Sequence, residues 1–259
     1  MTKTILITGA TDGIGLKAAE RLAADGHRVL LHGRNAAKLK AAAGGMAGET
    51  ETYLADLSRL PDVRSLAERV AAAHSQIDVL INNAGVFKTS DPSTPSGIDV
   101  RFVVNTIAPY ALTRALLARI PPEGRIVNLS SAAQAQVDVD ALTGHRPLGD
   151  MEAYSQSKLG ITIWSQALAR DLPNGPSVVA VNPGSLLATK MVTEGFGVAG
   201  SDVTIGSGIL VRAALSPDFE GVSGSYFDND SGRFAAPHRA AGDPDQVREV
   251  MAALERLIA

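Results

Sequence analysis

Two side chains that could move a proton together stand four residues apart, at Tyr154 and Lys158. Residues at this spacing share one face of a helix, so a phenol and an ammonium could act on one site. A phenol needs help near pH 7 because its unperturbed pKa is about 10. A neighbouring positive charge favours the tyrosinate and lowers that pKa. The pair predicts acid–base chemistry at an oxygen, although the same spacing also occurs among ordinary surface residues.

A glycine-rich segment, Thr8–Gly15, lies between the first predicted strand and the first predicted helix. Glycines allow a tight turn and close approach of a pyrophosphate, and the N–H groups that open a helix attract an anion. The spacing is G-x-x-x-G-x-G rather than the general G-x-G-x-x-G, and an ordinary strand-to-helix turn is the alternative. The residues expected at a dinucleotide here are Gly9, Thr11, Asp12, Gly13, Ile14 and Gly15.

The end of the second predicted strand indicates which dinucleotide is bound. An acidic residue there binds the ribose 2′-OH of NAD, whereas an arginine accommodates the 2′-phosphate of NADP. This segment carries Arg34 and Asn35 and no carboxylate, which favours NADP(H) over NAD(H). Asp12 points the other way, because a carboxylate in the glycine turn could lie near that phosphate. A solvated loop arginine is the alternative for Arg34.

Short apolar, β-branched runs alternate with longer segments of helical period, which predicts a parallel sheet with helices on both faces. The predicted strands are Thr4–Thr8, Arg28–His32, Thr50–Leu54, Val79–Asn82, Gly124–Ser130, Ser177–Asn182 and Gly224–Phe227. The predicted helices are Gly13–Ala24, Ala36–Ala43, Leu60–His74, Gly97–Ala118, Met151–Asp171, Ser201–Leu215 and Pro244–Ile258. We therefore expect one α/β domain over residues 1–259, a doubly wound Rossmann fold whose seven-stranded sheet is mostly parallel. The irregular segments 132–150 and 185–201 are expected on the substrate side, since loops usually carry specificity.

Composition limits the classes of function. The 259 residues are 45% hydrophobic and 20% charged, and the net charge of −3 gives no basic footprint for nucleic acid. The chain has no cysteine, which excludes disulfides and thiolate catalysis. Its five histidines are scattered without the spacing of metal ligands, so surface or loop positions are expected and no metal site is predicted.

The start of the chain and its hydropathy indicate the compartment. The first predicted strand begins at Thr4 and leaves no room for a signal peptide. The sequence contains no run of about 18 apolar residues, so no membrane span is predicted. We expect a cytoplasmic protein.

The chain resembles the short-chain dehydrogenases/reductases along nearly its whole length. The resemblance rests on motifs that follow the glycine turn in the family's order. These are Asp56-Leu57, Asn82-Asn83-Ala84-Gly85, Asn105, Ser130-Ser131, Tyr154-x-x-x-Lys158 and Asn182-Pro183-Gly184. A closer likeness to retinol-dehydrogenase-like and related bacterial members rests on Arg101-Phe102-x-x-Asn105, Arg125–Ser131 and Tyr154–Leu159.

The resemblance implies hydride transfer between a nicotinamide and a carbonyl or alcohol substrate. In this pattern Tyr154 is the acid and base, Ser131 donates a hydrogen bond to the substrate oxygen, and Lys158 holds the nicotinamide ribose. Asn105 shapes the active-site helix and supports a proton relay. The implied catalytic residues are Asn105, Ser131, Tyr154 and Lys158. Further implied cofactor contacts are Asp56, Leu57, Asn82, Asn83, Ala84, Gly85, Pro183 and Gly184, with a turn cap as the alternative for Asp56.

Two departures from the family pattern concern the substrate side. Ser131 and Tyr154 are 23 residues apart, wider than the common spacing, so segment 132–150 holds an insertion that should enlarge or cover that side. Thr189 stands one position later than the threonine the family often places after Pro-Gly, so the sequence does not place it at the cofactor.

Other functions stay open at this point. A non-catalytic NADP(H)-binding sensor or regulatory protein is one alternative, and a nucleotide-sugar epimerase or dehydratase is another. The resemblance also implies pairing of helices 97–118 and 151–171 between subunits, in a homodimer or homotetramer. The expected partner is otherwise a small carbonyl or alcohol.

Overall fold

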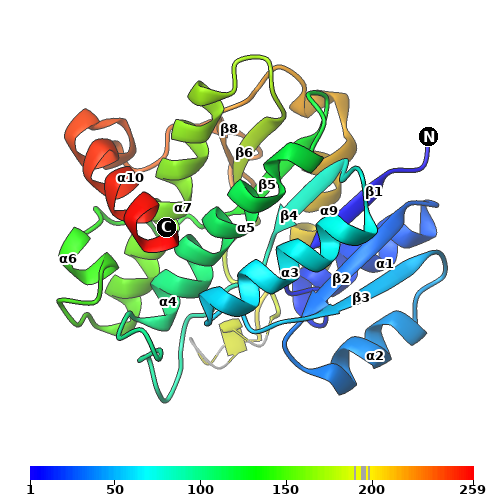
Figure 1. Cartoon of the computed structure of the whole chain (residues 1–259), viewed down its shortest axis with the longest axis horizontal. Helices are drawn as coiled ribbons and strands as arrows, with labels where there is room; N and C mark the ends of the chain where they lie inside the picture. Colours follow the sequence, from blue (N-terminus) through cyan, green and yellow to red (C-terminus); the bar gives the residue numbers. More distant parts are fainter. Residues whose placement is uncertain (190, 194–196, 198) are drawn as a thin grey trace.

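The structure is a computed structural model that describes residues 1–189, 191–193, 197 and 199–259. Its described residues form one sheet in the strand order β3-β2-β1-β4-β5-β6-β7-β8 (Figure 1). The strands are β1 Thr4–Ile7, β2 Arg28–Gly33, β3 Thr50–Leu54, β4 Val79–Asn82, β5 Arg125–Leu129, β6 Ser177–Asn182, β7 Tyr226–Asp228 and β8 Arg233–Ala235. β1 to β7 pair in parallel, which confirms the doubly wound α/β fold. The strand order reverses between β1 and β4, where ligands bind in such sheets.

Helices cover both faces of this sheet (Figure 1). The described helices are α1 Gly13–Ala24, α2 Ala36–Gly44, α3 Leu60–Ala73, α4 Val100–Phe102, α5 Ala108–Leu116, α6 Val139–Leu142, α7 Asp150–Asp171, α9 Val203–Leu215 and α10 Pro244–Ile258. A π-helical segment, Val103–Ile107, joins α4 to α5, and short 3₁₀ turns span Leu117–Arg119, Pro217–Phe219 and Arg239–Gly242.

The strands bury alternate side chains in two separate cores. Leu6, Leu30 and Leu80 pack with α3, α5, α7 and α10, whereas Ile5 and Ile7 pack with α1, α2 and α9. This division follows from the two-residue period of a strand, which sends neighbouring side chains to opposite faces. Because both faces are covered, the strands carry the continuous apolar runs seen in the sequence.

The prediction of seven strands was short by one, because the described residues form eight. β8 has only three residues and pairs antiparallel with β7 through a turn at Asn229–Gly232. It is too short to show a strand period, and it is exposed at the sheet edge. Phe234 nevertheless anchors it, with its ring 5.1 Å from that of Phe227 and 5.2 Å from that of Phe219.

The single helix predicted over residues 97–118 differs from the observed one in its start and its winding. Asp99 begins it by accepting a hydrogen bond from the Arg101 backbone N–H at 2.8 Å. The chain then widens into the π-helical turn that contains Asn105 before α5 continues. π-helical turns are rare and frequently occur at functional sites.

The insertion at residues 132–150 is not wholly irregular, because it folds into α6. Asp138 caps that helix, and Val137 and Leu142 are buried. Gln156 of α7 accepts a hydrogen bond from the Asp138 N–H at 2.8 Å, and Gln246 of α10 donates to the Val137 carbonyl at 3.1 Å. The insertion is therefore fixed between α7 and α10. Of the other substrate-side segment, 185–201, residues 190, 194–196 and 198 lie outside the described residues.

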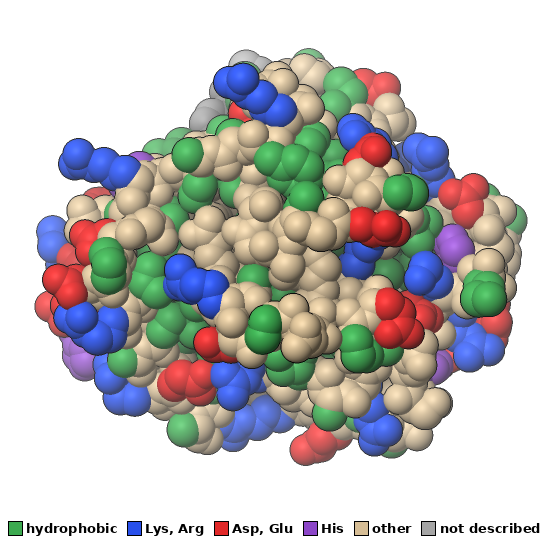
Figure 2. Space-filling view, turned by 90° about the horizontal axis from the view of Figure 1, so that it is seen from above, with side chains coloured by type: hydrophobic (Ala, Val, Ile, Leu, Met, Phe, Trp, Pro, Cys, Tyr) green, Lys and Arg blue, Asp and Glu red, His purple; other side chains and the backbone are tan. Residues whose placement is uncertain are grey.

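The surface carries no concentration of one charge on the face that Figure 2 shows, where basic and acidic side chains are interspersed. Among the described residues, no helix combines the length and apolar character that crossing a membrane requires.

Candidate active site

Helix α7 places Tyr154 and Lys158 one turn apart, facing the carboxyl ends of the central strands. The Lys158 Nζ lies 5.7 Å from the centre of the Tyr154 ring. Tyr154 is half-buried, and Lys158 is only 3% exposed. The helical spacing predicted from the sequence therefore brings the phenol and the ammonium to one site.

The backbone of β5 holds the Lys158 ammonium. Its Nζ donates a hydrogen bond to the Leu129 carbonyl oxygen at 2.8 Å, at the last residue of that strand. Burial lowers the pKa of Lys158 to about 8. With this pKa the amine is mostly protonated at neutral pH and loses its proton in mildly alkaline solution.

The direction of the Tyr154 pKa is opposite to the one expected. Burial raises the pKa of the Tyr154 phenol, and a hydrogen bond with the Ser131 side chain offsets only part of that effect. The Phe87 ring contributes to this apolar environment, edge-on to the phenol at a centroid distance of 5.0 Å. Strongly perturbed acid and base groups in one place are typical of catalytic sites.

Asn105 connects three parts of the site from the π-helical turn. Its side-chain oxygen accepts from the Val86 N–H at 2.8 Å, and its amide donates to the Val86 carbonyl at 2.9 Å. The same amide donates to the Ser157 hydroxyl at 2.9 Å, on the turn of α7 between Tyr154 and Lys158. Asn105 thus fixes the backbone next to Phe87 against the helix that carries the acid–base pair.

The two serines after β5 have different surroundings. Ser130 is buried and donates to the Lys158 carbonyl at 3.0 Å, so it supports α7. Ser131 is only half-buried and forms the hydrogen bond with Tyr154. Its hydroxyl also accepts from the Ala133 N–H at 3.1 Å. Ser131 is therefore the serine that could meet a substrate oxygen.

The glycine turn has the geometry of a phosphate cradle. Gly9 and Gly13 have φ of 67° and 52°, a region that favours glycine. A Cβ on Gly15 would lie 2.4 Å from the Asn83 Nδ2, whose amide donates to the Thr8 carbonyl at 2.8 Å. The Gly13 N–H donates to the Asp12 carboxylate at 2.9 Å, and the N–H groups that follow in the first turn of α1 have no partner inside the helix, so the turn fits a dinucleotide pyrophosphate.

Thr189 lies over this turn, although the sequence did not place it there. Its Cγ2 would be 3.4 Å from a Cβ on Gly13. Thr11 packs closely against Gly33, where an added Cβ would lie only 2.5 Å from the Thr11 Cγ2. Ile14 lies within van der Waals reach of Gly206 on α9. Thr11 and Ile14 thus shape the turn through their packing.

The residues predicted to choose the cofactor lie together beyond β2. Arg34 is exposed, and Asn35 caps α2 by accepting from the Lys38 N–H at 3.0 Å. The Lys38 Nζ lies 2.9 Å from the Asp12 carboxylate. Asp12, whose carboxylate argues against NADP(H), is therefore paired with Lys38. No local sequence pattern indicated this pair, because the two residues are 26 positions apart.

The expected adenine and nicotinamide positions occupy the loops after β3, β4 and β6. The Asp56 carboxylate accepts from the Ser58 N–H at 3.0 Å, as the turn-cap alternative predicted, and Leu57 is buried beside it. Asn82 lies in the core, where it donates to Asn128 at 2.8 Å. Asn83, Ala84 and Gly85 follow, with Ala84 donating to the Thr8 hydroxyl at 3.1 Å.

The Pro183-Gly184 segment is tied to the β7–β8 turn. Asn229 donates to the Pro183 carbonyl at 2.9 Å, and Gly184 has φ of 117°. Ser185 donates to Asp230 through its N–H at 2.8 Å. The turn that leads into β8, the strand that the sequence did not predict, therefore helps to fix a loop that borders the site.

His32 is a site residue that sequence reasoning missed, and its predicted surface position was wrong. It is 2% exposed. Its Nδ1 accepts from the Gly9 N–H at 3.2 Å, and its Nε2 lies 3.1 Å from the Ala55 carbonyl. A carbonyl can only accept, so Nε2 carries the proton and the ring is neutral. His32 joins the glycine turn to the end of β3. His74 is also buried, next to Tyr53.

Acid should weaken the fold through His32. Burial lowers its pKa from 6.5 to about 4, so the unfolded chain binds the extra proton between these values. Stability is therefore lost as the pH falls from 6.5 towards 4, by about 2 kcal/mol at about pH 5. Urea unfolding at about pH 7.5 and about pH 5 measures this loss, which should be smaller in His32→Gln. The exposed His145→Gln should keep the wild-type loss, and an unchanged loss in His32→Gln would reject this role.

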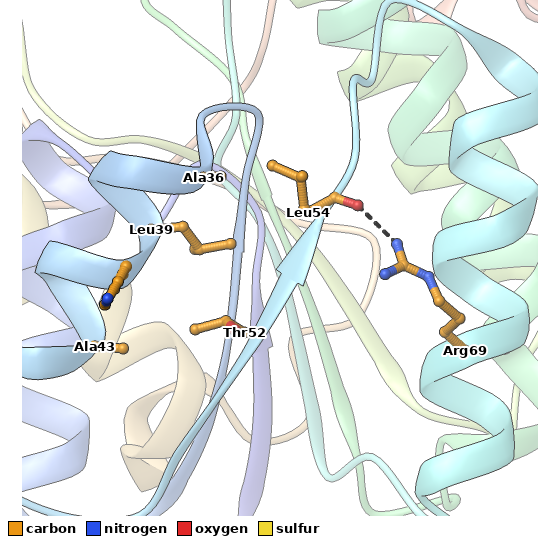
Figure 3. Close-up of a pocket in the computed structure, with 7 residues that line it drawn as sticks. Ala36, Leu39, Ala43, Thr52, Leu54 and Arg69 are labelled. Carbon is orange, nitrogen blue, oxygen red and sulfur yellow. Dashed lines mark hydrogen bonds between the residues drawn. The ribbon is translucent and has the colours of Figure 1, made fainter.

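A surface hollow lies elsewhere, at the free edge of β3 (Figure 3). It has a volume of about 400 Å³ and is bordered by α2, β3 and Arg69 of α3. Arg69 donates to the Leu54 carbonyl at 2.7 Å. None of the lining residues belongs to the group around Tyr154. The chemistry lies with the buried acid–base pair, so we place the candidate site there. No group of three or more possible metal ligands occurs among the described residues.

Known proteins resemble this chain in sequence. A family model described as short chain dehydrogenase matches residues 3–196. Retinol dehydrogenase 13 of Homo sapiens is 32% identical over 283 residues, which cover 99% of this chain and 84% of the human protein.

Solved structures resemble it in fold. A putative uncharacterized protein from Mycobacterium paratuberculosis has a TM-score of 0.83 at 30% identity, covering 99% of this chain and 93% of the other. A short chain dehydrogenase from Burkholderia cenocepacia, solved with NADP, has a TM-score of 0.72 at 29% identity and covers 89% and 97%. A 3-ketoacyl-(acyl-carrier-protein) reductase from Brucella melitensis, solved with NADH, has a TM-score of 0.71 at 25% identity and covers 89% and 98%.

Proposed function

Because the chain belongs to the short-chain dehydrogenase family, we propose that it interconverts a carbonyl and an alcohol with NADP(H), using Tyr154 as acid and base. It is an oxidoreductase of CH–OH and C=O groups, in keeping with its relatives. One observation carries the proposal for Tyr154. The Ser131 side chain acts on its phenol to lower the pKa, and the phenol lies one helical turn from a buried lysine whose Nζ is 5.7 Å from the ring centre.

The proposed mechanism follows from these contacts. The nicotinamide, when bound, supplies the hydride to a carbonyl carbon or takes it from an alcohol. Ser131 donates a hydrogen bond to the substrate oxygen as negative charge develops there. Tyr154 gives its proton to that oxygen, or takes it back in the reverse direction. The raised pKa of Tyr154 keeps the proton on the phenol before reduction, and Lys158 stabilises the tyrosinate that forms.

Asn105 and Lys158 organise the site around this step. Asn105 holds the Val86 backbone and Ser157. Neither α7 nor the loop after β4 must therefore rearrange during the proton transfer. Lys158 can turn one of its three N–H donors to a ribose hydroxyl while another keeps the Leu129 carbonyl. Gly85 lies beside this amine, since a Cβ there would be in van der Waals contact with the Lys158 Nζ at 3.6 Å.

The preference for NADP(H) is proposed from the charges beyond β2. Arg34 is exposed, and no carboxylate among the described residues is paired with it. Lys38 neutralises the carboxylate of Asp12, which would otherwise repel a 2′-phosphate. Solved relatives have been obtained with NADP and with NADH, so family membership alone does not fix the preference, and we propose it from these residues.

Arg34→Asp should reverse this preference. A hydrogen bond to a charged group contributes about 1.5–3 kcal/mol, so NADPH should bind about tenfold more weakly or worse. NADH affinity should hold or rise, because NADH has no 2′-phosphate and an acidic residue here can bind its ribose 2′-OH. Fluorescence titration with both cofactors measures the ratio. Lys40→Asp is the control, since it makes the same charge change on the exposed side of α2 and should leave the ratio unchanged. An unaltered ratio in Arg34→Asp would remove Arg34 from this role.

The function as a whole is tested by substrate turnover. NADPH oxidation is followed with ketones, aldehydes and quinones, and NADP reduction is followed with alcohols. Turnover with members of these panels is expected. A protein that binds NADPH tightly and turns over none of them would instead be a non-catalytic sensor or regulator.

A further inference from the structure

The backbone carbonyl of Ser131 is held from two directions. The Tyr226 hydroxyl donates a hydrogen bond to it at 3.0 Å, and the side-chain amide of Gln134 donates a second at 2.9 Å. A carbonyl oxygen has two lone pairs, so these two donors satisfy it completely. The peptide group that follows Ser131 is therefore fixed, which limits the directions in which the Ser131 side chain can extend.

The hydroxyl of Ser131 is also oriented. Its oxygen accepts a hydrogen bond from the Ala133 N–H at 3.1 Å, which restricts rotation of the side chain. That contact uses one lone pair of the oxygen and leaves the hydroxyl proton available for donation. The Ser131 side chain also lowers the pKa of Tyr154, so it acts on the phenol. The serine thus offers its proton on the side of the acid–base pair.

Tyr226 is a rigid donor because the sheet encloses it. It lies in β7 opposite Ala180 of β6 and opposite Ala235 of β8. Its side chain is buried, and burial raises the pKa of its phenol, so Tyr226 keeps its proton in neutral and alkaline solution. Tyr226 lies beyond residues 3–196, which the family model matches. The serine is therefore supported by a part of the chain outside that match.

Gln134 ties the same carbonyl to the chain after β8. Its amide nitrogen donates to the Ser131 carbonyl and, at 3.3 Å, to the Ser130 hydroxyl. Its amide oxygen accepts from the His238 N–H at 2.9 Å. Both ends of the amide are thus occupied, which fixes the side chain of this half-buried residue in one orientation.

We propose that Tyr226 and Gln134 are positioning residues for the reaction, and that by clamping the Ser131 carbonyl they direct the Ser131 hydroxyl toward the substrate oxygen beside Tyr154. This role rests on the proposed function, because Ser131 meets a substrate oxygen only if the chain interconverts a carbonyl and an alcohol. Neither positioning residue contacts the reacting atoms in this role, and each acts through Ser131.

Two substitutions remove one donor each from this clamp. Tyr226→Phe keeps the buried ring, whereas Gln134→Glu keeps an oxygen for the His238 N–H and loses the donor to Ser131. A less well-oriented serine stabilises the developing charge less, so each variant should lower kcat by about threefold to tenfold, the effect of one hydrogen bond. The KM for NADPH should not change. Tyr53→Phe, which removes the same atom from another buried phenol, should keep kcat.

A double-mutant cycle separates positioning of the serine from general stability. Ser131→Ala should lower kcat by about a hundredfold, which leaves measurable turnover. If Tyr226 acts through Ser131, adding Tyr226→Phe to Ser131→Ala should cause no further loss of kcat. The same fold loss in both backgrounds, or a wild-type kcat in Tyr226→Phe alone, would overturn the role of Tyr226. The same outcomes decide the role of Gln134.

Crystal structures keep this result separate from the proposed function. If the wild type turns over no carbonyl or alcohol, the proposed function fails, and the geometry of the serine alone decides the clamp. Crystals of Tyr226→Phe should then show the Ser131 hydroxyl displaced, or in a second rotamer, relative to wild-type crystals. A Ser131 side chain that stays in place would overturn the proposal. Gln134→Glu undergoes the same tests if Tyr226→Phe does not fold.

Discussion

Tyr154→Phe is expected to bind NADPH as the wild type does and to lose nearly all turnover. The substitution removes only the hydroxyl that is hydrogen-bonded to Ser131, and it keeps the ring packed on Phe87. A positioned acid or base contributes about 10²–10⁴-fold to rate, so kcat should fall by about a thousandfold. That fall corresponds to about 4 kcal/mol in the activation barrier. NADPH oxidation with a saturating carbonyl substrate measures kcat, and fluorescence titration measures cofactor binding.

The control for this experiment is Tyr53→Phe. Tyr53 is a buried residue of β3, and its hydroxyl lies 3.1 Å from the Nε2 of His74, the residue that follows α3. The same atom is removed, at a position outside the active site. This variant should lose some stability and keep kcat. Turnover like the wild type in Tyr154→Phe would show that another group moves the proton.

Arg101→Met is expected to destabilise the fold by about 3 kcal/mol, one of the largest effects of any single substitution in this chain. Arg101 is 1% exposed and binds Asp99 through two hydrogen bonds, at 2.8 and 2.6 Å, and also pairs with Asp150. Removing one partner of a buried ion pair leaves an uncompensated charge, which costs about 3–5 kcal/mol. Asp150 is half exposed, so the lower end of that range applies. Urea unfolding monitored by circular dichroism measures the loss.

This substitution should also affect catalysis. Asp150 opens α7 four residues before Tyr154, and Arg101 stands four residues before Asn105. The ion pair therefore holds the two helices that carry the site in register. Arg101→Lys should recover part of the stability, because lysine keeps the charge but not the planar set of donors.

The control for Arg101 is an ion pair on the surface. Lys17→Met removes the partner of Glu20, and both side chains are well exposed. Exposed pairs contribute about 0–1 kcal/mol, so this variant should unfold close to the wild type. An Arg101→Met protein as stable as Lys17→Met would mean that the Asp99 and Asp150 carboxylates find other partners.

Local sequence patterns predicted the parts of the fold that depend on local physics. Apolar runs placed β1, β2, β4, β5 and β6 within one or two residues, because these strands are buried on both faces and bounded by turns. The glycine turn was also predicted from local sequence, because Gly9 and Gly13 adopt backbone conformations that other residues rarely take. The spacing of Tyr154 and Lys158 needed only the helical period.

Features that depend on distant residues were missed. The Lys38–Asp12 pair and the burial of His32 arise because strands and helices meet in space, and no local pattern records this. The raised pKa of Tyr154 has the same origin, because it depends on how closely Phe87 and α7 are packed. β8 is too short to show any period, and its position depends on the ring of Phe234.

The anchoring of the Lys158 ammonium on the Leu129 carbonyl has an evolutionary consequence. Every amino acid offers the same carbonyl, so replacing the side chain at position 129 cannot delete this acceptor. The Val86 groups that hold Asn105 are likewise main-chain atoms. Neutral drift at these two positions can therefore change the side chains while the two main-chain anchors persist.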